Sequence, residues 1–433
     1  MRHNCALRHG SKWSTPPASE NAGRSRPFDG RMDSADGGAS GFPAAATPGV
    51  GAMGQVYSIV KNDVAAPLKL VFLVTHSSAG GAQEIWANLA EGFRQDGHHV
   101  TLMALYPLRE TVRDTSDALP WTYVVSKRPS TPWAAAGLIT ALVKWIRQNR
   151  PDFILTALPA ANILAGFCAW LAGTDTRVIP SHHSPTQTHN PVLDRIDGLT
   201  GSLPSVAYVI SVSNAVAASL DGKPARYRAK RRTIHNALPP PIEAAIAQLA
   251  AGRRRDWTPG RLVVATGRLA EQKNYPLLIR AAALMPDVQI GIVGNGPDEQ
   301  MLKDLAAQMG VTDRVTFHGH RPREQALSIL AQADIFAQVS LFEGHSLALV
   351  EAAQMGIPLV VSDVPVQIEG ITAADGTLCG IAVPVDSPEA LASAITGLLD
   401  DPDARQRATA KAEMLGQEAS YARMMDAYRA LMA

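Results

Sequence analysis

The 433-residue sequence lacks the features that would mark it for secretion, for a membrane interior or for nucleic acid. Its three cysteines, Cys5, Cys168 and Cys379, show neither metal-site spacing nor a disulfide framework, which suits a reducing cytoplasm. No run of about 18 uncharged apolar residues predicts a spanning helix, and no apolar signal core opens the chain. The formal net charge of +1 argues against general nucleic-acid binding.

The composition that is present is typical of a globular enzyme, with 46% hydrophobic and 18% charged residues. At this length, two domains are the default expectation. Residues 1–66 are rich in Gly, Ser, Pro, Ala and Asp without periodicity, and they predict a disordered extension. Met53 is an alternative start of the protein, and the sequence leaves that choice open.

Buried-strand patterns alternate with helical segments along the rest of the chain, as in Leu68–Val74 followed by a helix over about 82–95. This alternation predicts an α/β fold of two doubly wound, Rossmann-like domains that face each other across a cleft. The expected boundaries are an N-terminal Rossmann-like domain at 67–236, a linker at 237–258, a C-terminal Rossmann-like domain at 259–402 and a helical tail at 403–433.

Two carboxylates, Glu343 and Glu351, bracket the start of an expected helix. Between them, Gly344-His345-Ser346 forms a turn that feeds the helix N-terminus, where backbone N–H groups and the helix dipole favour an anion. A ligand with a phosphate in its middle and hydroxyls at both ends suits this arrangement. A nucleotide-sugar is such a ligand.

Four motifs in the second half occur in a specific order, each at or near a strand end. They are Gly267-Arg268-Leu269-Ala270-Glu271-Gln272-Lys273-Asn274, Val293-Gly294-Asn295-Gly296-Pro297, Glu343-Gly344 through Glu351-Ala352, and Gly356-Ile357-Pro358-Leu359-Val360-Val361-Ser362. In this order and spacing the chain closely resembles the family-4 glycosyltransferases of the GT-B fold, also called glycosyl transferases group 1. The resemblance covers about residues 68–400 and is stronger in the second domain.

The resemblance implies retaining transfer of a hexose-type sugar from a nucleotide-diphosphate-sugar to a saccharide or lipid-linked saccharide, in cell-surface polysaccharide or glycolipid biosynthesis. It implies that Arg268 and Lys273 hold the donor diphosphate, where cations stabilise the charge of the leaving group. By the same resemblance, Glu343 contacts the sugar and Glu351 the ribose. Neither a cofactor nor a metal is expected, because the two cations neutralise the diphosphate.

Further donor contacts are implied by position. Backbone N–H groups of the turn should reach sugar and phosphate oxygens, and relatives hold the base and diphosphate at glycine-containing strand ends. The residues carried over are Gly80, Gly81, Gly294, Gly319, His320, Gly344, His345 and Ser346. Because His345 and Ser346 depart from the family's usual aromatic and Gly or Pro, they are expected to set donor preference. His183 is the first choice for a histidine near the donor sugar, with His182 as the alternate.

Some alternatives stay open from the sequence alone. Six basic residues between Lys223 and Arg232 form either a solvated loop or a patch that faces an anionic membrane or a lipid-diphosphate acceptor. The sharper reading predicts peripheral association with anionic lipid at the inner face of the membrane. A non-catalytic nucleotide-sugar sensor and a GT-B sugar-nucleotide epimerase are the rival functions. An epimerase would need groups that remove a proton from the sugar ring, and no motif in the sequence supplies them.

Overall fold

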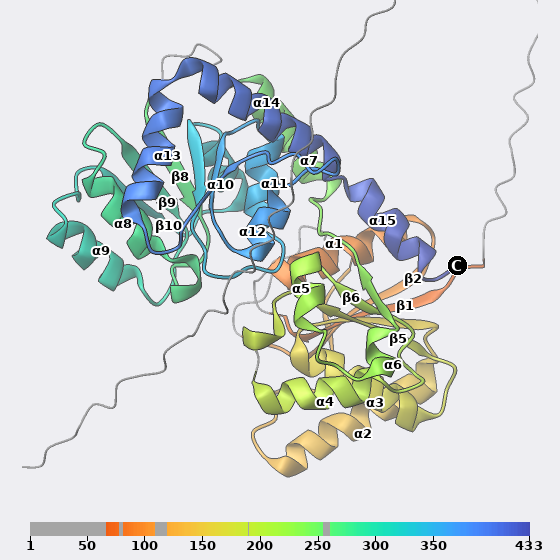
Figure 1. Ribbon diagram of the computed structural model, residues 1–433. Helices are drawn as coiled ribbons and strands as arrows, with labels where there is room; N and C mark the ends of the chain where they lie inside the picture. Colours follow the sequence, from red (N-terminus) through yellow and green to blue (C-terminus); the bar gives the residue numbers. More distant parts are fainter. Residues whose placement is uncertain (1–65, 78–80, 109–118, 189, 254–259) are drawn as a thin grey trace, which may run out of the picture. The chain divides into compact units, whose positions relative to one another are not determined.

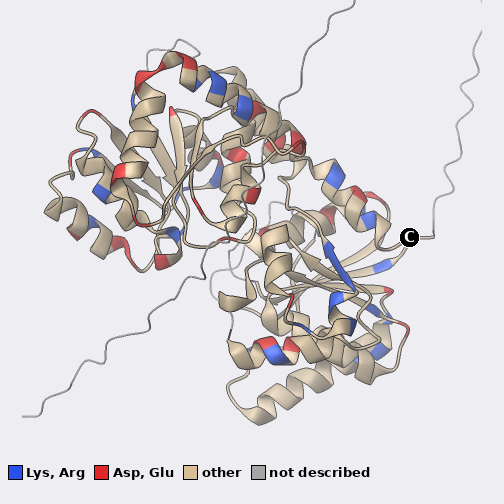
Figure 2. Cartoon of the chain, in the orientation of Figure 1, with Lys and Arg blue, Asp and Glu red and all other residues tan. Residues whose placement is uncertain are grey.

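The computed structural model describes residues 66–77, 81–108, 119–188, 190–253 and 260–433. Residues 1–65 of the extension predicted at 1–66, the alternative start at Met53 and the candidate residue Gly80 lie outside the described residues. The described residues form two parallel-sheet lobes, called here the first and second lobe, as the alternating pattern predicted. Acidic and basic side chains are interspersed over both lobes (Figure 2).

The first lobe is built on a seven-stranded sheet in the order β3-β2-β1-β4-β5-β6-β7, in which every neighbouring pair is parallel (Figure 1). Its strands are β1 Lys69–His76, β2 His99–Tyr106, β3 Thr122–Tyr123, β4 Phe153–Ala157, β5 Arg177–His182, β6 Val209–Ser211 and β7 Arg231–Thr233. Its helices are α1 Gly81–Gln95, α2 Pro132–Asn149, α3 Pro159–Ala172, α4 Pro191–Gly201, α5 Asn214–Ser219 and α6 Ala225–Arg228.

Strand β1 shows why the strands of this lobe are continuous apolar runs in the sequence. Phe72 packs in a cluster with α1, whereas Leu73 packs on the opposite face of the sheet with α2 and α3. Both side chains are fully buried. Since helices cover both faces of a parallel sheet, each strand must be apolar on both sides.

The second lobe has a six-stranded parallel sheet in the order β10-β9-β8-β11-β12-β13. Its strands are β8 Leu262–Thr266, β9 Gln289–Val293, β10 Val315–Gly319, β11 Ile335–Gln338, β12 Leu359–Ser362 and β13 Ile381–Val383. Its helices are α8 Tyr275–Ala283, α9 Glu299–Gln308, α10 Arg323–Leu330, α11 Leu347–Gln354, α12 Pro365–Gly370 and α13 Pro388–Asp400. Helices α8, α9 and α13 share one core cluster, and α10 and α11 share the other.

The segment expected as a linker and the helical tail both contain packed helices. Helix α7, Pro240–Ala251, lies within 237–258 and buries Ile246 in the second lobe's core. The tail forms α14, Pro402–Glu418, and α15, Tyr421–Ala430. Tyr428 of α15 returns to the first lobe, where its ring meets Trp86 edge-on at 6.3 Å. No helix in the described part of the chain has the length and apolar composition needed to span a bilayer.

Candidate active site

The N-terminus of α11 is closed by its own capping residue. Ser346 accepts a hydrogen bond from the backbone N–H of Leu349 (3.3 Å), and its hydroxyl donates to Oε1 of Gln338 (2.7 Å). The side chain is thus committed to the cap and to the end of β11. Any contribution of Ser346 to an anion site therefore rests on its backbone N–H.

An ion pair joins two of the predicted site residues beside this helix start. Nζ of Lys273 lies 2.7 Å from Oε1 of Glu343, and their side chains are only 14% and 10% exposed. Gln272 donates to the second carboxylate oxygen of Glu343 at 3.3 Å. A buried carboxylate needs such partners, and the pair places Lys273 beside the turn that leads into α11.

The glycines of the neighbouring loops are explained by close packing. A Cβ on Gly267 would lie 2.6 Å from Cε of Lys273, and φ at Gly267 is +145°. A Cβ on Gly294 would lie 1.9 Å from the carbonyl oxygen of Gly267. Gly294 therefore fits one loop against the next, and its contact with a donor stays a prediction. Arg268 has an exposed side chain with no ion pair to a described residue, so its guanidinium is available to a ligand.

Glu351 lies within α11 and is held by a cation from the preceding helix, α10. Arg323, the first residue of α10, donates to Glu351 and also to Glu84 on α1. Burial raises the pKa of Glu351 to about 7, although the guanidinium of Arg323 opposes the rise. The carboxylate expected to meet the ribose is thus one of a three-residue bridge. Neither Glu84 nor Arg323 stood out in the sequence, because neither belongs to a motif.

The expected base segment at the end of β10 has the backbone of a turn. Gly319 adopts φ +69°, and its carbonyl accepts a hydrogen bond from the N–H of Gly294 at 3.0 Å. His320 is exposed, whereas the ring of His318 lies against Gly291 of β9. The described residues contain no cluster of metal-binding side chains, at these histidines or elsewhere.

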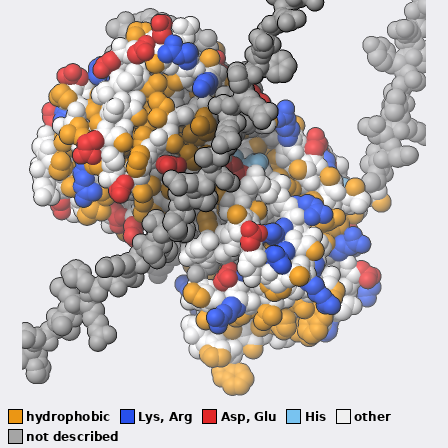
Figure 3. All heavy atoms as spheres, in the orientation of Figure 1, with side chains coloured by type: hydrophobic (Ala, Val, Ile, Leu, Met, Phe, Trp, Pro, Cys, Tyr) orange, Lys and Arg blue, Asp and Glu red, His pale blue; other side chains and the backbone are white. Residues whose placement is uncertain are grey.

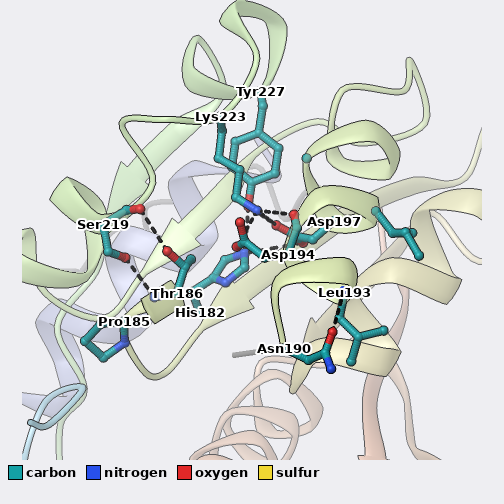
Figure 4. Close-up of polar contacts among 12 residues, drawn as sticks. His182, Pro185, Thr186, Asn190, Leu193, Asp194, Asp197, Ser219, Lys223 and Tyr227 are labelled. Atoms are coloured by element: carbon teal, nitrogen blue, oxygen red, sulfur yellow. Dashed lines mark hydrogen bonds and ion pairs between the residues drawn. The ribbon is translucent and has the colours of Figure 1, made fainter. Parts of the chain in front are cut away.

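The two histidines at the end of β5 point in different directions. His182 turns into the lobe, where its Nε2 lies 2.7 Å from the hydroxyl of Tyr227, which in turn donates to Asp197 (2.9 Å) (Figure 4). His183 instead has its Nε2 3.2 Å from Oγ of Ser181 and its ring edge-on to Trp86 at 5.2 Å. The alternate, His182, is therefore committed to a buried network.

His183 lies where the second lobe meets the first. An ideal Cβ on Gly344 would fall 1.9 Å from the carbonyl oxygen of His183, so the turn before α11 backs directly onto this residue. Burial lowers the pKa of His183 to about 3, and the adjacent His182 adds to the effect. The imidazole is neutral at physiological pH, so it can act through a hydrogen bond and not through charge.

The side chain of His345 lies beside another histidine, and its expected role in donor preference stays a prediction. Its ring lies 5.1 Å from that of His235, and both line a cavity of about 410 Å³ formed with α11, α12, α14 and α15. His235 also pairs with Glu369 at 2.8 Å. The side chain of His345 therefore faces the junction of the lobes and not the Lys273–Glu343 pair. Only its backbone remains as a candidate donor contact.

The basic run is only partly a surface patch. Buried Lys223 pairs with Asp194 (2.7 Å) and Asp197 (3.0 Å), as Figure 4 shows. Lys230 donates to the carbonyls of residues 201 and 203, and Arg231 pairs with Asp221. Half of the six charges thus satisfy internal acceptors, because α4 and the turns that follow α4 and α5 supply carboxylates and carbonyls that the sequence pattern did not reveal. Arg226, Arg228 and Arg232 remain exposed.

Comparisons with known proteins agree with this geometry. The family model described as "Glycosyl transferases group 1" matches residues 256–414, and the one described as "Glycosyltransferase Family 4" matches residues 79–240. A D-inositol 3-phosphate glycosyltransferase of Mycobacteroides abscessus is 36% identical over 37% of this chain and 36% of its own length. A phosphatidyl-myo-inositol mannosyltransferase of Mycolicibacterium smegmatis is 28% identical over 77% of this chain and 84% of its own. The matches to the first curated relatives span about a third of those relatives' lengths.

Solved structures confirm the fold class. The Anabaena protein HepE in complex with UDP and glucose aligns with a TM-score of 0.69 at 17% identity, over 84% of this chain and 98% of that protein. Sucrose-phosphate synthase from Thermosynechococcus elongatus aligns with a TM-score of 0.66 at 20% identity, over 84% and 99% of the two chains. At these low sequence identities, the structural likeness shows a shared fold.

Proposed function

The chain belongs to the glycosyl transferases group 1 family, with the GT-B fold, and from this we propose that it is a retaining glycosyltransferase. The proposed reaction moves a hexose-type sugar from a nucleotide-diphosphate-sugar to a saccharide or lipid-linked saccharide. The polysaccharide and glycolipid pathways of the cell surface use such products. The observation that carries the proposal is the buried Lys273–Glu343 pair beside the start of α11.

The chemistry follows from where charge develops. As the glycosidic bond breaks, the diphosphate gains negative charge, which Lys273, Arg268 and the N–H groups of α11 can stabilise. The acceptor hydroxyl enters on the side of the leaving group, so the anomeric configuration is retained. The departing phosphate takes the proton of the hydroxyl. In this scheme Glu343, once Lys273 turns to phosphate, is released to accept hydrogen bonds from the sugar. The protein contributes positioning and electrostatics, and no cofactor is required.

A panel of nucleotide-sugars and nucleoside diphosphates tests the proposal. UDP and UDP-glucose come first, since HepE was solved with both. At 100 times its Kd, the true donor should stabilise the protein by about 2.7 kcal/mol, which thermal denaturation detects. Slow release of nucleoside diphosphate without acceptor is expected of the transferase. Binding without any release would favour the sensor, and no binding across the panel would contradict the proposal.

We also propose that the enzyme works at the cytoplasmic face of a membrane, where a lipid-linked acceptor would be presented. Four exposed apolar side chains lie on α4, Val192, Leu193, Ile196 and Leu199, and hydrophobic atoms gather on this edge of the lobe in Figure 3. The exposed arginines Arg226 and Arg228 lie on α6, which packs against α4. Together they supply apolar area and positive charge for anionic lipid.

Vesicle sedimentation checks this contact. At low salt, more protein should be recovered with vesicles containing anionic lipid than with neutral ones, and the difference should vanish at high salt. The double variant Arg226→Gln with Arg228→Gln should lose most of the difference, whereas Lys303→Gln on the second lobe should keep it. Equal recovery with both vesicle types would refute membrane association.

A further inference from the structure

One guanidinium connects the two lobes at the predicted ribose carboxylate. Nη1 of Arg323 donates to Oε1 of Glu84, in the first turn of α1, and Nη2 donates to Oε1 of Glu351, on α11. The exposed fractions of these side chains are 25% for Arg323, 26% for Glu84 and 12% for Glu351. The fork of an arginine fits two carboxylates at once, which a lysine could not do with fixed geometry.

Two polar atoms of this bridge have no hydrogen-bond partner among the described residues. Oε2 of Glu351 accepts no hydrogen bond from a described residue, and Nε of Arg323 is buried without a partner among them. A ribose with two neighbouring hydroxyls offers both a donor and an acceptor. It could therefore donate to Oε2 of Glu351 and satisfy the remaining polar groups of the bridge.

The charge of Glu351 depends on this contact. Burial has the largest effect and favours the neutral carboxyl, Arg323 opposes it and Glu84 adds to it; together these influences raise the pKa of Glu351 to about 7. Charged groups on other elements packed against α11 lie elsewhere: Glu413 of α14 lies against Gly356, and Glu243 of α7 accepts from the backbone of Tyr421. Arg323 is thus the cation that holds the pKa of Glu351 below the value that burial alone would give.

We propose that Arg323 is a positioning residue for donor recognition: anchored by Glu84 of the first lobe, it holds Glu351 as an oriented carboxylate for the ribose hydroxyls. Ribose binding is then coupled to the approach of α1, the helix of the first lobe that carries Glu84. This inference rests on the proposed function and adds to it a link between the lobes.

Nucleoside diphosphate binding by the Arg323→Gln variant tests the positioning role. The probe is whichever of UDP, GDP and ADP stabilises the wild type most, and its Kd is measured by calorimetry from pH 6 to 9. At pH 7 the variant should bind roughly tenfold more weakly, the value of one charged hydrogen bond. Without the cation the pKa of Glu351 rises further, so the deficit should shrink as pH increases. Arg280→Gln, an exposed arginine on α8, should bind like the wild type.

The Glu84→Gln variant tests the coupling. Loss of the anchor should weaken binding several-fold without moving the pH profile upward, because Arg323 still pairs with Glu351. In the Arg323→Gln background the same change should have no further effect. An unchanged Kd and pH profile for Arg323→Gln, or additive losses in the double variant, would overturn the inference. If the wild type bound none of the three nucleotides, the proposed function itself would fail.

Discussion

Replacing Lys273 with alanine should lower turnover by roughly 10²–10³-fold, the loss typical when one preorganised charge stabiliser is removed from an active site. The change removes the cation that lies 2.7 Å from Glu343, and among the described residues it leaves that buried carboxylate only Gln272 as a hydrogen-bond partner. The charge on the departing diphosphate would then be stabilised by Arg268 and the start of α11 alone. The measurement is the initial rate of nucleoside diphosphate release with a saturating donor.

A structural role for Lys273 makes a different prediction. If the residue served only to satisfy Glu343, the midpoint of thermal unfolding would fall but the activity per folded molecule would persist. Lys303→Ala removes a lysine from an exposed pair with Glu299, whose side chains are 46% and 35% exposed, and it should change neither property. Turnover of Lys273→Ala within a few-fold of the wild type would refute the diphosphate clamp.

The sheets were predictable because their signal is local. The central strands of both lobes, such as β1 and β8, are short apolar runs bounded by loops, and a parallel sheet covered on both faces requires such runs. The start of α11 was also predictable, since a glycine and a capping serine precede its apolar face. Helix α7 lies inside the segment expected as a linker, and prolines occupy its first turn, where a missing N–H group leaves no helical hydrogen bond unmade.

Side-chain directions at the site could not be read from the sequence. Glu84 and Arg323 are separated by 239 positions, so their contact depends on how two lobes meet. The placement of His345 depends on His235, a residue of another element that the motif does not include. Likewise, the sequence does not distinguish Lys223 from its exposed basic neighbours. Only the fold shows that Lys223 is buried beside Asp194 and Asp197 of α4. Local patterns predict elements, whereas these contacts arise only from packing.

Replacing Gly344 with alanine should abolish most of the activity while each lobe keeps its fold. The new Cβ would lie 1.9 Å from the carbonyl oxygen and 2.7 Å from the carbonyl carbon of His183. Both are backbone atoms, so no side-chain rotation relieves the clash, and the turn before α11 must retreat from the first lobe. A shift of about 1 Å in the positions of the reacting groups lowers the rate on the order of 100-fold. The measurement is kcat/KM for sugar transfer.

The Gly344→Ala variant distinguishes donor binding by the second lobe from the contact between the two lobes. Because Lys273 and Glu351 belong to the second lobe, the affinity of Gly344→Ala for nucleoside diphosphate should change much less than its turnover. Backbone strain does not explain such a loss, since Gly344 is not among the glycines with positive φ. Gly397→Ala, on an exposed turn of α13 with nothing within 4 Å of the new Cβ, is the matched control and should stay fully active. Near-normal turnover of Gly344→Ala would show that the turn and His183 need not meet during the reaction, and that the lobes act at a greater separation than this structure holds.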